Sequence, residues 1–292
     1  MSLKLLLTLI ILIIIIIVIR YVKKKFYKID SFKNPVQTIY VKNNYDKFYA
    51  PIYSTLISDQ IKERTIFEVD DLIEKTNLDN YQNARILDIG CGGGDHMKLI
   101  NNKKINNIEI IGIDKSEAML NETRKRIRKN SNNIRLVKRN IYESDLFTTN
   151  SFSHILCYYF TIYSLNSKKI VKKVKSLLRP KGWFVVHMVD LEKFDPVLDA
   201  SSPFLGIDPQ KYVKNRVTNS TVHFKKFIYK SSFNLNKDNF KFEETFEFKK
   251  KPIVRKQKQV LENIKLDKFI DEMGKELLEL QSTTSLNDYG YH

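Results

Sequence analysis

The sequence predicts an α/β protein with a doubly wound parallel sheet and an antiparallel β insertion, preceded by a single N-terminal transmembrane helix. Three observations predict this architecture: an uncharged apolar run near the N-terminus, strand–helix alternation from 85 to 189, and a period of two in the apolar residues after 221. Alternating strands and helices are typical of a parallel sheet with helices on both faces. We expect an anchor with a basic flank at 1–28 and one domain at 29–292, with an insertion or lid over about 196–262.

The apolar run comes first in the chain. Leu5 to Ile19 carries no charge, and Lys4 and Arg20 can extend their ammonium and guanidinium groups toward the interface, so residues 3–22 are long enough for a span. A cleaved signal peptide is the alternative, but bulky and basic residues follow the run where cleavage needs small ones. The positive-inside rule then places the C-terminal part in the cytoplasm, as a single-pass membrane protein, because five basic residues follow the run: Arg20, Lys23, Lys24, Lys25 and Lys28.

The next elements follow from helical and strand periodicity. Aromatic residues at helical spacing predict a helix over 45–57, kinked by Pro51, and a second amphipathic helix covers 61–75. Strands are then expected at 85–89, 108–113, 134–137, 152–158 and 183–189, and helices at 96–101, 118–128 and 168–178. Ser116 is the expected N-cap of the helix at 118–128.

Beyond residue 190 the pattern changes from helical to strand-like. A loop at 196–216 precedes expected strands at 221–229 and 240–249, which a turn at 234–239 joins; a helix at 266–273 and a strand at 276–280 follow. In the strand at 240–249, Phe alternates with polar residues, so one face is apolar. Glu244 falls on that apolar face, where it binds an amine or marks a bulge or a strand edge.

A glycine cluster directly follows the first strand of the alternating region, in the run ILDIGCGGG. Gly90, Gly92 and Gly94 allow the backbone to approach a ligand and to turn into a helix, whose first N–H groups are free. Asp88 places a carboxylate at the strand end. A dinucleotide motif would need glycine where Asp95 stands, and no Gly-Lys-Ser/Thr follows. An acidic residue in this loop suits a cationic amino acid moiety better than a pyrophosphate.

The next two strand ends add polar groups of different kinds. Asp114 ends the second strand, where a carboxylate can accept both hydroxyls of a ribose. Asn140 follows the third strand and can hydrogen-bond an adenine edge, with Ile141 against the adenine face. Three neighbouring strand ends therefore predict an amino acid site, a ribose site and an adenine site.

These motifs resemble the class I S-adenosylmethionine-dependent methyltransferases. ILDIGCGGG, the GID at 112–114 and LRPKGWFVV at 178–186 carry the resemblance, which covers roughly residues 40–280. It implies a Rossmann-like sheet of seven strands with S-adenosylmethionine across its carboxyl end. The expected cofactor-binding residues are Asp88, Gly90, Cys91, Gly92, Gly94, Asp114, Lys115, Asn140, Ile141, Tyr158 and Tyr49.

Three features refine the resemblance. The family often has Asp where Asn140 stands. YDKFYAPIY, CYYFTIYSL and HMVDLEKFDP are similar to small methyltransferases of large DNA viruses. The family's seventh strand is missing or only begun, because the sequence stops at His292, and a truncated chain or an altered sheet edge would explain this.

We expect methyl transfer by in-line displacement to a small-molecule or lipid-associated acceptor. Such a reaction needs alignment, and a base only where the acceptor must lose a proton. The candidate catalytic residues are His187, Tyr159 and Tyr163, with tyrosine faces available to a sulfonium. The alternative for each is a place in the core, with its polar group satisfied.

Composition and charge supply the competing hypotheses. Two cysteines among 292 residues cannot supply a disulfide framework or a cysteine zinc cluster, and no metal is expected. Cys157 is not preceded by Pro and is expected to be a small apolar strand residue. The net charge of +17 favours an anionic membrane surface or RNA, but six of these charges flank the apolar run. An RNA (cap-type) methyltransferase and a catalytically inactive interaction protein are therefore the alternatives.

Overall fold

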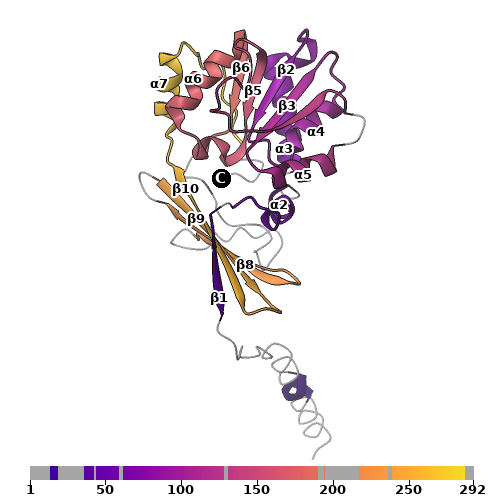
Figure 1. Cartoon of the computed structure of the whole chain (residues 1–292), viewed down its shortest axis with the longest axis vertical. Helices are drawn as coiled ribbons and strands as arrows, with labels where there is room; N and C mark the ends of the chain where they lie inside the picture. The colour runs from indigo at the N-terminus through magenta and orange to yellow at the C-terminus, as the bar shows by residue number, and fades with distance from the viewer. Residues whose placement is uncertain are drawn as a thin grey trace, which may run out of the picture.

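Two five-stranded sheets form the fold, one parallel and one mostly antiparallel (Figure 1). The structure is a computed structural model that describes residues 14–18, 36–42, 44–58, 62–127, 131–189, 194, 217–235 and 239–286. The parallel sheet has the order β4-β3-β2-β5-β6, and its carboxyl edge faces the second sheet. Its strands are β2 (Arg85–Ile89), β3 (Glu109–Asp114), β4 (Ile134–Lys138), β5 (Phe152–Cys157) and β6 (Leu178–Val186).

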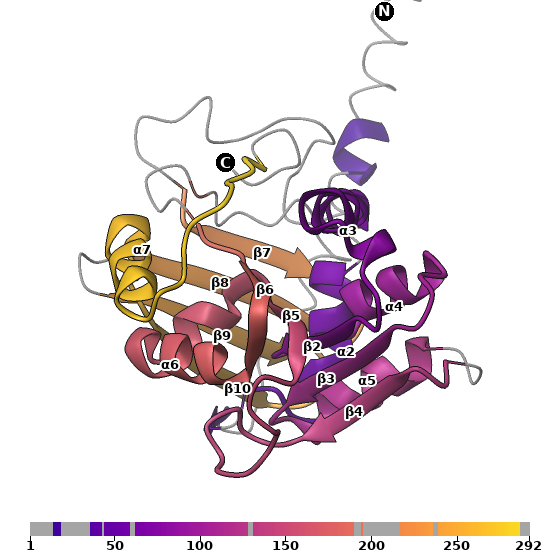
Figure 2. The ribbon, with the colours of Figure 1, turned by 90° about the horizontal axis from the view of Figure 1, so that it is seen from above.

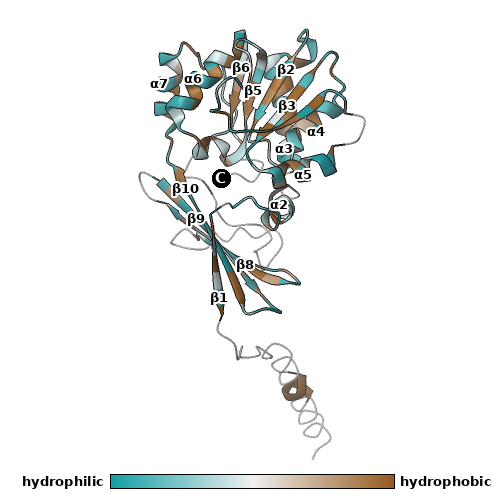
Figure 3. Cartoon of the chain, viewed as in Figure 1, coloured by the Kyte–Doolittle hydropathy of each residue, from teal (hydrophilic) through white to brown (hydrophobic). Residues whose placement is uncertain are grey.

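The parallel sheet is buried on both faces, as the doubly wound prediction requires. Leu87 and Ile111 face one apolar cluster and their neighbours Ile86 and Ile110 face the other, because successive side chains of a strand alternate. Helices cover both faces (Figure 2): α3, α4 and α5 pack on one cluster, and α6 and α7 on the other. These helices are α3 (Lys62–Thr76), α4 (Asp95–Asn102), α5 (Glu117–Arg126), α6 (Ser167–Leu177) and α7 (Leu266–Lys275). In Figure 3 the strands of this sheet are mainly hydrophobic and the outer helix faces hydrophilic.

Local sequence explains where these helices begin. The side chain of Ser116 accepts a bond from the Met119 N–H at 3.2 Å, which confirms the expected N-cap of α5. Asn166 caps α6 in the same way, through the Lys169 N–H at 3.0 Å. Short helical turns complete this part at Leu78–Asn80 and Tyr159–Ser164.

The helix expected over 45–57 is shorter than predicted. Asp46 Oδ1 accepts the N–H groups of Phe48 and Tyr49, so α2 (Tyr49–Tyr53) begins there and continues as the π-helical turn Ser54–Ser58. Pro51 lies in the first turn of α2, where its missing N–H removes no helical bond. The aromatic face is present, but the helix begins four residues later than the pattern suggested.

The second sheet has the order β1-β10-β9-β8-β7. Its strands are β1 (Gln37–Val41), β7 (Asn219–His223), β8 (Phe227–Leu235), β9 (Asn239–Phe248) and β10 (Ile253–Glu262). β1 pairs with β10 in parallel, and the other pairs are antiparallel. The expected insertion is therefore joined by β1, a strand from before the parallel sheet that the sequence pattern did not reveal.

Two expected strands are wrong. The strand at 221–229 is in fact two strands, β7 and β8, because the Phe224 N–H bonds to the Phe227 carbonyl at 3.0 Å and closes a hairpin. The strand at 276–280 is absent from the described chain, because α7 ends there in a turn. The N–H of Leu278 bonds to the carbonyl of Met273, and Leu277 has a φ of 59°. Such a turn is a common way to end a helix.

The parallel sheet therefore ends on β6 within the described chain. A groove of about 1810 Å³ runs beside β6, between α3, α7 and residues 277–286. Glu68, Tyr158 and His187 lie among its lining residues. Thr284 donates a bond to Asp71 of α3 at 3.1 Å, so the C-terminal segment reaches the helix on the far wall.

The predicted membrane span at 3–22 falls almost entirely outside the described residues. Only residues 14–18 are described there, as helix with exposed side chains. Over the described parts of the chain, no helix combines the length and the apolar character that crossing a bilayer requires.

Candidate active site

The glycine loop after β2 has the geometry that the sequence predicted. Gly90, Gly92 and Gly94 have φ values of 69°, 52° and 75°, in the left-handed region that favours glycine. A Cβ at Gly90 would lie 2.5 Å from a Thr161 methyl group. The loop leads directly into α4, whose first N–H groups are available to an anionic ligand group.

Asp114 fastens this loop to the end of β3. Its Oδ2 accepts the Gly92 N–H at 3.1 Å, and its Oδ1 accepts the Ser116 N–H at 2.8 Å. Burial raises the pKa of Asp114, and these two bonds oppose the rise. Each carboxylate oxygen retains capacity for another donor, so the group can hold two hydroxyls of a ribose.

The acidic residues of the loop have different environments. Asp88 is buried at the end of β2, and burial raises its pKa to about 6. Asp95, where a dinucleotide motif would have glycine, forms an ion pair with Arg126 at 2.7 Å. Asp95 is therefore paired with a cation of the chain itself, and a contact of Asp88 with a cationic amino acid moiety remains a prediction.

Asn140 and Ile141, the residues expected at the adenine, follow the end of β4 and already make contacts within the protein. Asn140 Oδ1 accepts the Tyr142 N–H at 3.1 Å, which forms a local turn. Ile141 is buried in the apolar cluster beside Val137. Lys115 is exposed, and Cys91 is buried beneath the loop. Their contacts with a cofactor remain predictions.

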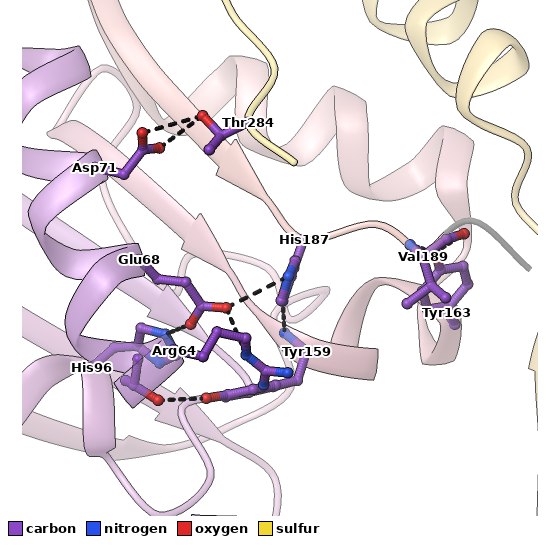
Figure 4. A network of polar contacts seen from close by, with 10 residues as sticks. Arg64, Glu68, Asp71, His96, Tyr159, Tyr163, His187, Val189 and Thr284 are labelled. Carbon is purple, nitrogen blue, oxygen red and sulfur yellow. Dashed lines mark hydrogen bonds and ion pairs between the residues drawn. The ribbon is translucent and has the colours of Figure 1, made fainter. Parts of the chain in front are cut away.

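A buried polar network lies at the carboxyl ends of β5 and β6 (Figure 4). Glu68 of α3 is its centre: Oε2 lies 2.7 Å from His96 Nε2, and Oε1 lies 3.0 Å from Arg64 Nε. Burial alone would raise the pKa of Glu68, but its bond to His96 and the neighbouring charges hold the pKa below its usual value. Glu68 is therefore an ionised carboxylate inside the protein.

His187 and Tyr159 are held by this network. His187 Nδ1 accepts the backbone N–H of Tyr159 at 3.3 Å, and Nε2 lies 3.5 Å from Glu68 Oε1. Burial lowers the pKa of His187 to about 4, so the ring is neutral at pH 7 and carries its proton on Nε2. Tyr159 has a φ of 53°, and its hydroxyl is 2.9 Å from Thr65 Oγ1. The geometry favours a positioning part for His187, and its role as a base remains a prediction.

Tyr158 and Tyr163 flank the same strand end. Tyr158 is buried and stacks on His96 with 3.9 Å between ring centroids. The hydroxyl of Tyr163 accepts the Val189 N–H at 2.6 Å, and its ring contacts Phe240 of β9 at 5.3 Å. Tyr163 thus joins the two sheets, and a catalytic part for it remains a prediction.

Sequence reasoning missed Arg64, Thr65 and Glu68. Arg64 and Glu68 are four residues apart on α3, on one stripe with the buried Leu72. Two charges in line with a core residue are unusual for an amphipathic helix, and this spacing was the available signal.

Tyr49 also belongs to a buried polar cluster, which lies on the second sheet. Its hydroxyl donates to Glu244 Oε1 at 2.6 Å. Glu244 pairs with Ser231 on one side and Gln257 on the other in uninterrupted ladders, so the bulge and the strand edge considered for it are wrong. Glu244 lies instead on the inner face of the second sheet, turned toward the parallel sheet.

Among the described residues, neither the cysteines nor the other side chains that can bind metals form a further site. Cys157 is buried in β5, and burial raises its thiol pKa, as suits an apolar strand residue. Within the described ranges, no group of three or more His, Cys, Asp or Glu side chains is arranged to hold a metal ion.

The comparison with protein families decides the identity. A family model described as a methyltransferase domain matches residues 80–250, which is more than half of the chain. The chain belongs to the methyltransferase domain family. This match confirms two predictions at the level of the family: that the protein is a methyltransferase, and that its cofactor is S-adenosylmethionine. The similarity to viral methyltransferases remains a prediction.

Solved methyltransferase structures share the fold. An S-adenosylmethionine-dependent methyltransferase from Clostridium acetobutylicum is 20% identical, with a TM-score of 0.56, over 80% of this chain and 87% of that chain. The CcbJ methyltransferase from Streptomyces caelestis is 16% identical, with a TM-score of 0.59, over 83% and 90%. The sugar N-methyltransferase KedS8 from a Streptoalloteichus species is 15% identical, with a TM-score of 0.53, over 84% and 88%. Identities this low establish the fold alone.

One curated relative matches part of this methyltransferase. It is an uncharacterized protein of Methanocaldococcus jannaschii, 26% identical over 148 residues. The match covers 51% of this chain and 48% of the relative, so the aligned part spans about half the length of that protein.

Proposed function

We propose that this methyltransferase transfers the methyl group of S-adenosylmethionine to a small-molecule or lipid-associated acceptor. The observation that carries the proposal is the glycine loop fastened to Asp114 by the Gly92 N–H. The hydrogen bond brings a glycine-rich backbone and a carboxylate together, which suits a ligand with an amino acid end and a ribose. The residues present therefore fit the cofactor.

Each part of the loop has a task in this proposal. The backbone at Gly90 to Gly94 approaches the amino acid part of the cofactor, the Asp88 carboxylate faces its ammonium group, and Asp114 accepts the ribose hydroxyls. The cofactor supplies a methyl group on a positively charged sulfur. Alignment of the acceptor with that methyl group is the main task of the chain's own residues.

The second sheet supports a small acceptor. It covers the carboxyl edge of the parallel sheet and contacts it through aromatic pairs, Tyr163 with Phe240 and Phe160 with Phe233. A cover of this kind limits access and excludes water from the reacting atoms. The sugar N-methyltransferase among the similar folds is in line with such an acceptor.

Replacement of Asp114 by asparagine is expected to weaken cofactor binding about 10- to 100-fold. The reason is that hydrogen bonds to a charged group contribute about 1.5–3 kcal/mol. Isothermal titration calorimetry with S-adenosylmethionine measures the change. Glu117→Gln is the matched control, because Glu117 is a half-buried carboxylate three residues further on whose charge is paired with Arg124. Absence of cofactor binding by the unaltered protein would contradict the proposed function.

We also propose that residues 3–22 anchor the enzyme in a membrane, with the catalytic domain in the cytoplasm. The uncharged run and the basic residues after it support this. The full chain is expected in the membrane pellet after alkaline carbonate extraction. Ile13→Lys with Ile16→Lys is expected to move it to the supernatant, since each central charge costs about 2.5–3.5 kcal/mol. A catalytic domain protected from protease inside sealed microsomes would contradict the orientation.

A further inference from the structure

We propose that Glu244 and the tyrosines around it bind a cationic amino group of the methyl acceptor. This inference rests on the proposed methyltransferase function and names the chemical class of the acceptor. The ligand is an amine that is protonated when it binds, held by charge and by aromatic faces. Tyr49, one of the residues expected at the cofactor, contacts Glu244 through its hydroxyl.

The position of Glu244 is the first argument. It lies at the middle of β9 and is 1% exposed, among the phenylalanines of the inner face. That face turns toward the carboxyl edge of the parallel sheet, where the cofactor site lies (Figure 1). A carboxylate among apolar residues in a continuous ladder loses hydration and gains nothing for strand pairing.

The partners of Glu244 are the second argument. Oε1 accepts the hydroxyls of Tyr49 at 2.6 Å and Tyr229 at 2.9 Å, and Oε2 accepts the Gln257 amide at 2.7 Å. All three donors are neutral, so they satisfy hydrogen bonds without supplying a counter-charge. Oε2 has capacity for a further donor, because each carboxylate oxygen offers two lone pairs.

Arg255, a cation whose charge acts on Glu244, is paired with another carboxylate. Arg255 Nη1 donates to Asp46 Oδ2 at 2.7 Å, and Nη2 donates to the side-chain amide oxygen of Gln257 at 2.8 Å. Its charge lowers the pKa of Glu244 only as the smallest of several influences, while burial raises that pKa. A buried carboxylate whose hydrogen-bond donors are all neutral is stabilised by an incoming cation, which gives selectivity for an amine over a neutral group.

Further aromatic rings pack against the two tyrosines that bond to Glu244. Tyr45, Tyr49 and Tyr53 lie with ring centroids 5.6–6.0 Å apart. Phe246 of β9 lies 6.0 Å from Tyr49 and 5.2 Å from Tyr229. Such ring faces attract alkylammonium groups through their quadrupoles, an effect that adds to the charge of Glu244.

Tyr45 connects this point to the cofactor site. Its carbonyl accepts the Ser116 hydroxyl at 2.5 Å, and Ser116 is the residue whose N–H binds Asp114. Burial raises the pKa of the Tyr45 hydroxyl to about 12, and the charges of both Glu244 and Asp114 add to the rise. Tyr45 therefore links the ring of Tyr49 to the turn that carries Asp114, which puts an amine at Glu244 next to the residues proposed to hold the cofactor.

The test compares two probes of equal shape that differ in charge. The full chain is loaded with S-adenosylhomocysteine, and benzylamine and benzyl alcohol are titrated by calorimetry. The unaltered protein is expected to bind benzylamine at least ten-fold more tightly, and Glu244→Gln to reduce this preference below two-fold. Glu243→Gln is the matched control, because Glu243 is the exposed neighbour on the outer face and should keep the preference.

The remaining outcomes distinguish a failure of this inference from a failure of the proposed methyltransferase function. Equal binding of the two probes, or a preference that survives in Glu244→Gln, overturns the inference. Failure to bind S-adenosylhomocysteine overturns the proposed function instead. If Glu244→Gln does not fold, the variant Tyr49→Phe decides. It keeps the aromatic ring and the Glu244 carboxylate, and it frees the lone pair of Glu244 Oε1 that accepts the Tyr49 hydroxyl. Benzylamine should then bind at least as tightly as to the unaltered protein, and a lost preference overturns the inference.

Discussion

Replacement of Glu68 by glutamine is expected to lower the free energy of unfolding by about 3–5 kcal/mol. The carboxylate faces Arg64, which is buried, and it also bonds to His96. Loss of the negative charge leaves the guanidinium facing a neutral amide in the protein interior. Urea denaturation of the full chain, followed by tryptophan fluorescence and circular dichroism, measures the change.

Glu74→Gln is the control for this experiment, because Glu74 is an exposed carboxylate on the same helix. Its unfolding free energy should change by less than about 0.5 kcal/mol. Equal denaturation midpoints for the two variants would show that the Glu68 network does not stabilise the fold. Glu68→Gln should also weaken cofactor binding, since Glu68 holds His187 against the backbone of Tyr159.

Replacement of Gly94 by alanine is expected to destabilise the protein by about 3 kcal/mol, through a left-handed φ and a steric clash together. Gly94 has a φ of 75°, and its added Cβ would lie 2.4 Å from the Thr123 methyl group. Thr123 cannot withdraw easily, because its hydroxyl donates to the Gly92 carbonyl at 2.6 Å. Thermal unfolding measures the loss.

Two further variants divide this effect into its parts. Gly94→Ala combined with Thr123→Ser removes the clashing methyl group but keeps the hydroxyl, so about half of the lost stability should return. Gly274→Ala in α7 has open space around its Cβ and should gain about 0.5–1 kcal/mol. If Gly94→Ala were as stable as Gly274→Ala, the tight contact between the glycine loop and α5 would be refuted.

The parallel sheet was predictable because its signals are local. β2 and β3 are short runs of apolar residues, and Ser116 caps the helix that follows β3 from within its own turn. The glycine loop and Asp114 were predictable for the same reason, since strand end, glycine and acid lie within one stretch of chain.

Strand β10 of the second sheet was less predictable because polar residues occupy its inner face. Arg255 and Gln257 of β10 are buried, so the strand shows no apolar alternation. The bond from Tyr49 to Glu244 joins residues 195 positions apart, and the Glu68 network joins α3 to the end of β6. Contacts of this kind depend on the tertiary arrangement, and no local pattern marks them.

The parallel pairing of β1 with β10 also dictates the order in which the protein can fold. Gln37 pairs with Ile253, and Arg255 binds Asp46 across 209 positions. Strand β1 is therefore synthesised long before β10, the strand with which it pairs. Contacts of such long range slow folding, and domains form from the N-terminal side during translation. All five strands of the parallel sheet are synthesised before β10, so β1 remains unpaired on the nascent chain until β10 appears. The second sheet is therefore completed only after all strands of the parallel sheet, and α7, which packs on the parallel sheet, follows it in the chain.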